Sequence, residues 1–250
     1  MKKVFALLFA FTLVITLGAC GRDDELEVLY DGYALVHGHY VGVVNIEVDE
    51  DGIITDIMLD EYYLPYNWAK VSADHAEEDD VLHVVQRGND VYYAKYIMIG
   101  DKLFTGTVAA AGSYVDYTAE GVDDFYAWID DEENANWYVH QIQDENFFLA
   151  NADGTESDYE RVDANSNEAM TKSESNYWRF GALGWLGNVE ETIAAFVGMA
   201  LTEEVTMVRD DEGTDATNLW TVNDAVTGAT WSDFPDYYEV IQRAYDNVTE

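Results

Sequence analysis

The sequence is poor in cysteine and in basic residues. Cys20 is the single cysteine among 250 residues, which excludes an intrachain disulfide, a cysteine-bound zinc and an iron–sulfur cluster. Only 12 residues are Lys or Arg against 50 that are Asp or Glu, so the formal net charge is -38. Nucleic acid is therefore excluded as a partner, because phosphate backbones are bound by clustered Lys and Arg.

The motifs of common catalytic sites are also missing. The chain has no nucleophile motif, phosphate-loop signature or haem attachment pattern. His37 and His39 would share one face of a strand, but no third ligand accompanies them, so we expect no metal site. The acidic turn at 49–52 resembles a calcium loop only in part, because its twelfth position is Met58 where a bidentate Glu is needed.

Residues 1–19 have the features of an export signal. Two lysines precede an apolar run from Val4 to Leu17, and small residues follow. The segment Leu17-Gly18-Ala19-Cys20 resembles a bacterial lipobox, which implies cleavage before Cys20 and acylation of its thiol. We therefore expect a protein lipid-anchored at the extracytoplasmic face of the cell membrane, with 20–29 as the lipidated cysteine and a charged tether. A secreted protein with an incidental cysteine is the alternative.

Residues 30–250 are predicted to form one folded domain. The sequence is 48% hydrophobic and 14% aromatic, which argues against disorder despite the charge and assigns the acidic residues to the surface. The alternation of apolar and polar residues predicts a β-hairpin that turns at 49–52. The side chains predicted to point toward the core are those of Val44, Ile46, Val48, Ile53, Thr55, Ile57 and Leu59. A second hairpin is predicted to turn at Gly100-Asp101.

Helical spacing appears in two segments in the middle of the chain, 122–143 and 188–201. Residues 122–143 fit one or two amphipathic helices, and the polar stretch 151–175 is predicted to be a long surface excursion. Asn188 and Glu191 form a capping-box-like pair before a helix whose apolar residues run from Ile193 to Leu201. The predicted fold class is α+β, with antiparallel hairpins packed against helices.

The C-terminal segment 219–248 is predicted to form a strand, a tight turn and a helix. Residues 219–226 are strand-like, 227–230 are small, and Ser232 or Asp233 can cap a helix that has Pro235 in its first turn. The predicted buried face of this helix comprises Phe234, Tyr238, Ile241, Tyr245 and Val248. Free N–H groups at a helix start favour a phosphate near Thr230. Nearby Asp residues repel an anion, so these residues alone favour an ordinary strand, turn and acidic cap.

The segment from Asp224 to Ser232, DAVTGATWS, resembles the D-x-x-[ST]-G-A-T-x-[ST] signature of the FMN-binding domain family. That family includes the C subunit of the sodium-translocating NADH:quinone reductase, the G subunit of Rnf and extracellular electron transfer lipoproteins. The stretch 31–60 is similar to the family's opening, with a D-G-x-Y-like start and two strands around an acidic D-G turn. The match leaves residues 61–218 as a long middle insertion in an FMN-binding-domain-like fold.

The resemblance implies one covalent FMN. A flavin transferase would attach FMN to the Thr230 hydroxyl as a phosphoester, and the surrounding signature comprises Asp224, Thr227, Gly228, Ala229, Trp231 and Ser232. The expected function is that of an electron carrier between a membrane electron donor and an external acceptor, with no catalytic residues of its own. The sequence departs from the family at Asp233, where a second hydroxyl residue is common, and it lacks the E-T-P-G-like stretch of the respiratory subunits.

Aromatic side chains are the candidates for contact with the flavin ring. Trp231, or a glycine-containing loop with Tyr177, Trp178, Phe180 and Trp185, would supply flat apolar walls, although each of these rings is equally consistent with the core. Two other functions remain open on the sequence. One is a flavin-free ligand-binding or structural surface lipoprotein, and the other is a flavin-bearing module whose catalytic partner is a separate polypeptide.

Overall fold

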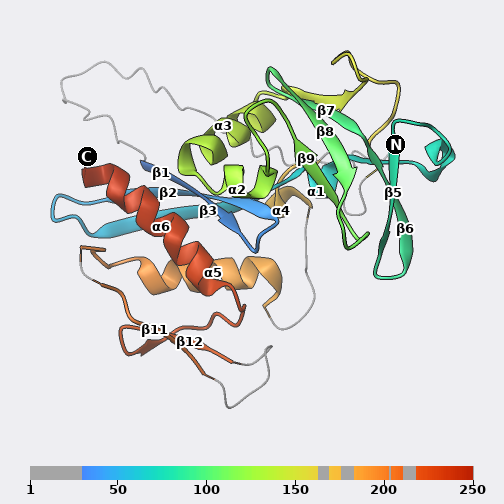
Figure 1. Cartoon of the computed structure of the whole chain (residues 1–250). Helices are drawn as coiled ribbons and strands as arrows, with labels where there is room; N and C mark the ends of the chain where they lie inside the picture. Colours follow the sequence, from blue (N-terminus) through green and yellow to red (C-terminus); the bar gives the residue numbers. More distant parts are fainter. Residues whose placement is uncertain (1–29, 163–168, 176–182, 203, 211–217, 250) are drawn as a thin grey trace, which may run out of the picture.

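A computed structural model describes residues 30–162, 169–175, 183–202, 204–210 and 218–249. These residues form a mixed α+β fold in which four small antiparallel sheets pack with helices (Figure 1). The predicted fold class is confirmed at this level. The expected signal peptide, Cys20 and the tether lie outside the described residues.

The first sheet is built from β1 (Tyr30–Val36), β2 (Tyr40–Val48) and β3 (Ile54–Tyr63), in the order β1-β2-β3. The predicted hairpin across 49–52 is confirmed, and the Asp49 carboxylate closes its turn by accepting the N–H groups of Asp51 and Ile53. The inward phase of β3 was predicted wrongly at its start. A register shift at Glu47/Val48 buries Ile54 and leaves Thr55 exposed.

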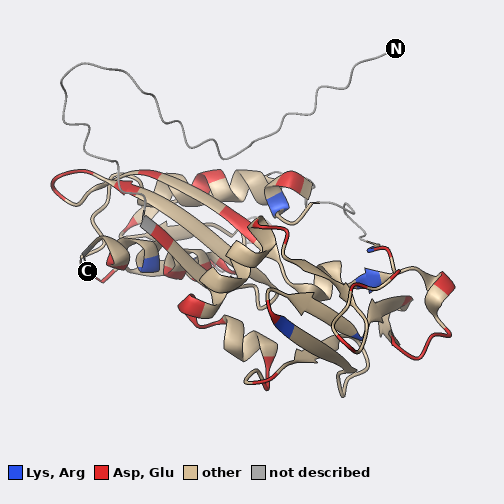
Figure 2. Ribbon diagram, turned by 90° about the horizontal axis from the view of Figure 1, so that it is seen from above, with Lys and Arg blue, Asp and Glu red and all other residues tan. Residues whose placement is uncertain are grey.

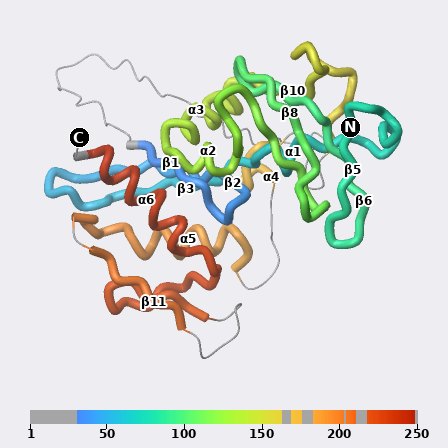
Figure 3. The backbone as a smooth tube through the Cα atoms, viewed as in Figure 1, coloured from blue at the N-terminus to red at the C-terminus, as the bar shows by residue number. Residues whose placement is uncertain are grey.

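Helices cover both faces of this sheet. The C-terminal helix α6 (Phe234–Thr249) crosses one face beside α5 (Gly184–Phe196), as the tube in Figure 3 shows. Gly32 permits the close approach of α6, because a Cβ there would lie 2.3 Å from the Val240 carbonyl oxygen. The helices α2 (Phe125–Ile129) and α3 (Glu132–Gln143) pack on the other side, where Tyr33 meets His140. The predicted helices within 122–143 are confirmed as two.

Two further sheets come from the middle of the chain. One has the strand order β10-β7-β8-β9 and comprises β7 (Tyr96–Ile99), β8 (Lys102–Val108), β9 (Val115–Thr118) and β10 (Phe147–Ala150). The other has the order β4-β6-β5 and comprises β4 (Lys70–Val71), β5 (Val81–Gln86) and β6 (Asn89–Ala94). The hairpin predicted at Gly100-Asp101 is confirmed, since Ile99 pairs with Lys102.

The last sheet precedes α6 and consists of β11 (Met207–Arg209), β12 (Trp220–Val222) and β13 (Ala225–Val226). The prediction of one strand over 219–226 was wrong, because the chain reverses at Asn223 and Asp224. Both residues have positive φ, 46° and 69°, the turn conformation that Asn and Asp tolerate best after Gly. The predicted final helix is confirmed, and Phe234, Ile241 and Tyr245 belong to its buried face, together with Tyr237, Val240 and Ala244.

Short elements connect these parts: α1 (Pro65–Trp68), the 3₁₀ helix η1 (Ala73–His75) and α4 (Lys172–Ser175). The prediction of a surface excursion over 151–175 was wrong at its end. Met170, Thr171 and Lys172 are buried, and the Met170 carbonyl accepts the Tyr63 N–H beside β3. Residues 163–168 of that stretch lie outside the described residues.

The predicted start and end of α5 were also wrong. The helix begins at Gly184, so Asn188 and Glu191 lie inside it and do not cap it. It ends at Phe196, where Gly198 with a φ of 89° turns the chain out of helical geometry before Leu201.

Acidic side chains are spread over turns and helix surfaces of the described chain (Figure 2). Glu61 and Lys172 are the charged side chains that are buried in this part of the protein. None of the helices in the described residues combines the length and apolar content required to span a bilayer.

Candidate functional site

The segment 227–233 follows β13 and leads into α6. It was predicted as a tight turn, but residues 227–230 form an irregular stretch with a bend at Gly228. The segment is held against β12, because the Trp220 carbonyl accepts the Thr227 N–H and the Trp220 N–H binds the Ala229 carbonyl. The fully buried Ala229 side chain anchors the segment in the core. Thr230 is thereby fixed at one position between the sheet and the helix.

Asn188 holds Thr230 from the opposite side. Its Oδ1 accepts the Thr230 N–H at 2.7 Å, the Trp231 N–H at 3.2 Å and the Thr230 hydroxyl at 3.3 Å. The Asn188 amide nitrogen donates to the Gly184 carbonyl at 2.8 Å, which sets the orientation of the amide. Asn188 is 1% exposed, so all four contacts are made away from solvent.

Glu191 lies one turn further along α5 and binds the bend in the segment. Its Oε2 accepts the Gly228 N–H at 3.1 Å. A Cβ on residue 228 would lie 2.2 Å from that carboxylate, so glycine is needed for this approach. The Ala229 N–H binds the Thr227 hydroxyl oxygen at 3.2 Å.

The backbone N–H groups of residues 228–231 therefore all have acceptors within the protein. These four groups are therefore not free to bind a phosphate, and the expectation for the N–H groups at the start of α6 stays a prediction. Asp224 lies in the exposed turn before β13 and is absent from the cavity wall described below.

Thr230 lines a cavity of about 1230 Å³. Its neighbours in the wall are Trp231, Ser232 and Asp233, together with the first turn of α5. The turn between β1 and β2 contributes His37 and His39, and the β5–β6 hairpin forms the far wall. The volume exceeds the roughly 300–1,000 Å³ that is usual for small-molecule sites.

The cavity wall is basic, in contrast to the rest of the chain. Four of the eight Lys and Arg residues in the described ranges line it, namely Lys70, Arg87, Lys172 and Arg209. The only Asp or Glu residues in the described lining are Asp90 and Asp233, and each of these carboxylates contacts a histidine. The described lining thus holds more basic than acidic side chains, with Lys172 paired to the buried Glu61 behind the wall.

Arg209 connects the basic wall to the threonine segment. Its Nη2 donates to the Thr230 carbonyl at 3.0 Å. Ser232 is exposed, and its hydroxyl donates to Asp233 at 2.9 Å. Thr230, Trp231 and Ser232 all line the cavity, whereas Thr227, Gly228 and Ala229 shape the segment behind them.

The predicted aromatic contacts are only partly accessible. The Trp231 ring stacks on Tyr237 with centroids 3.8 Å apart and an interplanar angle of 3°, and Trp231 is 4% exposed. Trp185 also lines the cavity and donates its Nε1–H to Glu61 at 2.5 Å. Tyr177, Trp178 and Phe180 lie outside the described residues. The roles of these rings toward a flavin stay predictions.

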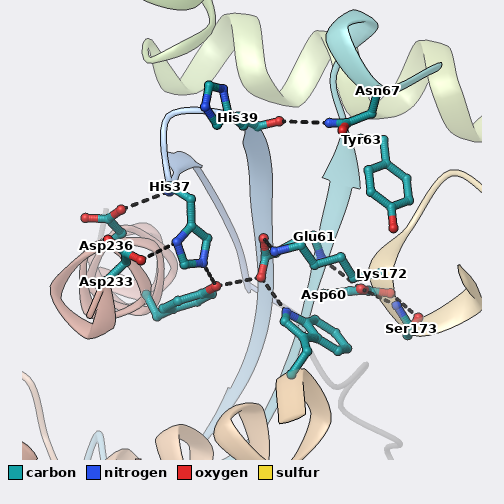
Figure 4. A network of polar contacts seen from close by, with 12 residues as sticks. His37, His39, Asp60, Glu61, Tyr63, Asn67, Lys172, Ser173, Asp233 and Asp236 are labelled. Carbon is teal, nitrogen blue, oxygen red and sulfur yellow. Dashed lines mark hydrogen bonds and ion pairs between the residues drawn. The ribbon is translucent and has the colours of Figure 1, made fainter. Parts of the chain in front are cut away.

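A chain of polar side chains runs behind the cavity wall (Figure 4). His37 Nδ1 lies 2.5 Å from Asp233 Oδ2, and His37 Nε2 contacts the Tyr237 hydroxyl. Tyr237 donates to Glu61 Oε1 at 2.6 Å, and Glu61 Oε2 lies 2.5 Å from Lys172 Nζ. His37, Lys172 and Asp233 all line the cavity, so this chain leaves the wall and returns to it.

Burial shifts the acid–base equilibria in this region. It lowers the pKa of the Lys172 ammonium from its ordinary 10.5, although Glu61, Asp60 and Asp233 oppose the shift. Burial raises the pKa of the Asp60 carboxyl, with hydrogen bonds from Ser173 acting in the opposite direction. Burial also raises the pKa of the Tyr237 hydroxyl well above 10.0.

His37 and His39 do not share a strand face. Both lie in the turn between β1 and β2, where His37 has a φ of 52°. His37 contacts α6, whereas the His39 ring stacks on Tyr66 of α1 with centroids 5.3 Å apart. Burial lowers the pKa of His39, and the nearby His37 lowers it further.

Sequence reasoning missed Asn188 as a contact of Thr230, and it missed the buried pair of Glu61 and Lys172. One signal for Glu61 was present, because the inward alternation of Ile57 and Leu59 continues onto residue 61. A glutamate at an inward position requires a partner, and Lys172 supplies it from 111 residues later in the chain. No local pattern marks Lys172.

Comparisons of this chain with protein-family models, with curated proteins and with solved structures found no match.

Proposed function

We propose that this protein is a flavoprotein that carries one FMN as a phosphoester on Thr230 and relays electrons. The observation that carries the proposal is the position of Thr230. This threonine lines a large basic cavity in a strongly acidic chain. A phosphoester on this hydroxyl would place negative charge where the described lysines and arginines gather. The match of DAVTGATWS to the family signature supplies the identity of the group.

The residues present fit such a group. Arg209, Lys70 and Arg87 are the candidates to hold its phosphate and other polar atoms, and the lining tyrosines Tyr66 and Tyr92 add flat surface. The cavity exceeds the usual volume of a small-molecule site, so the size of FMN presents no obstacle. The flavin, when bound, supplies the one- and two-electron chemistry, and the protein supplies position and electrostatics.

The proposal includes the cellular setting expected from the sequence. A lipid on Cys20 would confine the carrier near a membrane electron donor and raise the effective concentration of their encounters. The proposed fold is that of an FMN-binding domain with a middle insertion, 61–218. This insertion contains Lys70, Arg87 and Arg209 of the cavity wall, so it would help to hold the cofactor.

The direct test is covalent flavin on the protein itself. The full chain is co-expressed with a flavin transferase, and fluorescence is measured on a denaturing gel. The wild type and Thr230→Ser retain a fluorescent band, because both keep a hydroxyl at the position, and Thr230→Ala loses it. Thr192→Val is the matched control, since Thr192 is a buried threonine of α5 outside the cavity lining. A wild type without fluorescence contradicts the proposal and leaves a flavin-free lipoprotein.

A second variant pair tests the basic wall. Arg87→Ala removes an exposed cation that lines the cavity, and Lys102→Ala removes a half-buried cation that does not line it. We expect Arg87→Ala to weaken binding of unattached FMN to the Thr230→Ala protein by about tenfold, because a charge-assisted hydrogen bond contributes about 1.5–3 kcal/mol. Equal dissociation constants for the two variants would exclude the basic wall as the FMN site.

A further inference from the structure

The contacts behind the cavity are consistent with a chain of hydrogens that runs from His37 to Glu61. The Tyr237 hydroxyl has a single hydrogen, and it donates that hydrogen to Glu61 at 2.6 Å. The Tyr237 oxygen must then accept from His37 Nε2. Asp233 Oδ2 also accepts from the Ser232 hydroxyl, which fits a carboxylate that receives a second hydrogen from His37 Nδ1.

The two ends of this chain differ in their access to water. His37 and Asp233 have side chains that are 22% and 37% exposed. Glu61 and Lys172 at the other end are 0% and 3% exposed. A continuous path thus joins a solvent-accessible acid–base pair to a buried lysine of the cavity wall (Figure 4).

The charged surroundings of both ends are specific. Lys172 faces Glu61 and Asp60 from β3, the Tyr40 ring from β2 with Nζ 3.7 Å from its centroid, and Asp233 from the segment before α6. His37 faces Asp233, Tyr237 and, through its backbone N–H, the Asp236 carboxylate, all from α6 or the segment before it, with His39 beside it in the same turn. Burial lowers the pKa of Lys172, which makes its ammonium a better proton donor.

We propose that His37, Tyr237, Glu61 and Lys172 form a proton relay from solvent to the cavity, with Lys172 as the group that gives a proton to a ligand as that ligand is reduced. This inference rests on the proposed function, which supplies the redox ligand and the electron donor. Tyr237 joins His37 to Glu61 in this path, so removal of its hydroxyl interrupts the relay.

The proton balance is complete without a further reactant. A Lys172 N–H bond breaks and its hydrogen bonds to the ligand, while the electrons come from the membrane donor of the proposed function. His37 Nε2 passes a proton to the Tyr237 oxygen as the Tyr237 hydrogen moves to Glu61 Oε1. Rotation of the Glu61 carboxyl presents that proton to Lys172. His37 keeps its Nδ1 hydrogen, so its ring turns to take a proton from water on the emptied Nε2, and the Tyr237 hydroxyl then turns back toward Glu61.

The test removes one hydroxyl. Tyr237→Phe keeps the ring that stacks on Trp231 and breaks the link between His37 and Glu61. Tyr238→Phe is the matched control, because the adjacent hydroxyl donates to Gln242 and belongs to no part of the chain. Urea unfolding of both variants verifies that they are folded, and the fluorescent gel band verifies that each carries flavin.

The kinetic readout is the rate of flavin reduction in normal and in heavy water. We expect Tyr237→Phe to slow proton-limited reduction on the order of 100-fold, the lower range of general acid–base catalysis, and to change its solvent isotope effect. Tyr238→Phe keeps the wild-type rate and isotope effect. A Tyr237→Phe protein that carries flavin and matches the wild type in both quantities overturns the relay and leaves the proposed function standing.

A readout on flavin-free protein separates the two proposals. NMR of nitrogen-labelled histidine follows the hydrogen that His37 Nε2 shares with the Tyr237 hydroxyl. In the wild type we expect this hydrogen to be protected from exchange with water, and in Tyr237→Phe, where it loses its acceptor, we expect it to exchange faster. Identical exchange rates in the two proteins overturn the relay whether or not any flavin is attached.

Discussion

The side-chain oxygen of Asn188 lies 2.7 Å from the backbone nitrogen of Thr230, and the two residues come from a helix and a loop that are 42 positions apart. The same oxygen accepts the hydroxyl of Thr230 at 3.3 Å. One buried amide therefore fixes both the backbone and the hydroxyl hydrogen of the proposed acceptor. The Thr230 hydroxyl donates its hydrogen to Asn188, so its lone pairs point away from that amide oxygen.

Asn188→Ala removes this fixation. We expect the free energy of unfolding to fall by about 1–3 kcal/mol, because the buried N–H of Trp231 loses its acceptor. We also expect flavin attachment to slow by about 100-fold, the cost of misplacing a reacting atom by about 1 Å. Urea titration and the time course of gel fluorescence measure the two effects. Thr192→Val on the same helix should change neither, since its buried hydroxyl has no hydrogen-bond partner in the described residues.

The second prediction concerns Gly228 and Glu191. Gly228→Ala places a Cβ against the Glu191 carboxylate and displaces it, so the hydrogen bond to the residue 228 N–H is lost. Glu191→Ala loses the same hydrogen bond without a collision. The double variant should therefore be about as stable as Glu191→Ala alone, which gives a coupling energy of about 0.5–3 kcal/mol. If the losses in free energy of unfolding of the two single variants add up in the double variant, residues 228 and 191 are not in contact in solution.

Regular elements with a strong local pattern were predictable from the sequence. The hairpin around Asp49 has alternating apolar residues and a D-G turn, and α6 has apolar residues at helical spacing. Both were predicted and both form. The phase error at Thr55 arose because the register shift at Glu47/Val48 adds a residue without a distinctive sequence signature.

The site was predictable only in part, for a physical reason. Thr230 and its neighbours were found because they form a contiguous signature, but their partners come from distant parts of the chain. Asn188 and Glu191 were interpreted as a helix cap, since their spacing of three fits a capping box, whereas tertiary structure uses the same spacing to bind the threonine segment. The basic cavity wall is assembled from isolated residues, so no stretch of sequence displays it.

The third prediction concerns the buried ion pair of Lys172 and Glu61. Lys172→Met should lower the free energy of unfolding by about 3–5 kcal/mol, because it leaves an uncompensated carboxylate in the interior. The double variant Lys172→Met with Glu61→Gln should recover part of this loss, since the buried charge is gone. Glu239→Gln is the control, as it breaks an exposed pair with Arg243 and should have no measurable effect. A double variant less stable than Lys172→Met would contradict the assignment of a buried charge.

The last prediction is a loss of stability at alkaline pH. Burial raises the pKa of several tyrosines above the ordinary 10.0, with Tyr117, Tyr138 and Tyr237 buried deepest. A raised folded-state pKa means that the unfolded chain releases these protons first. The stability they contribute is fully present below pH 10.0 and is lost as the pH rises through their folded-state values. Urea midpoints should therefore fall between about pH 10 and about pH 11, and unfolding there should add a step of tyrosinate absorbance beyond that of exposed tyrosines such as Tyr114. Tyr117→Phe should flatten the fall, because it removes one such proton. A midpoint that is constant over this range, or unfolding without an added absorbance step, would show that these hydroxyls are accessible to water.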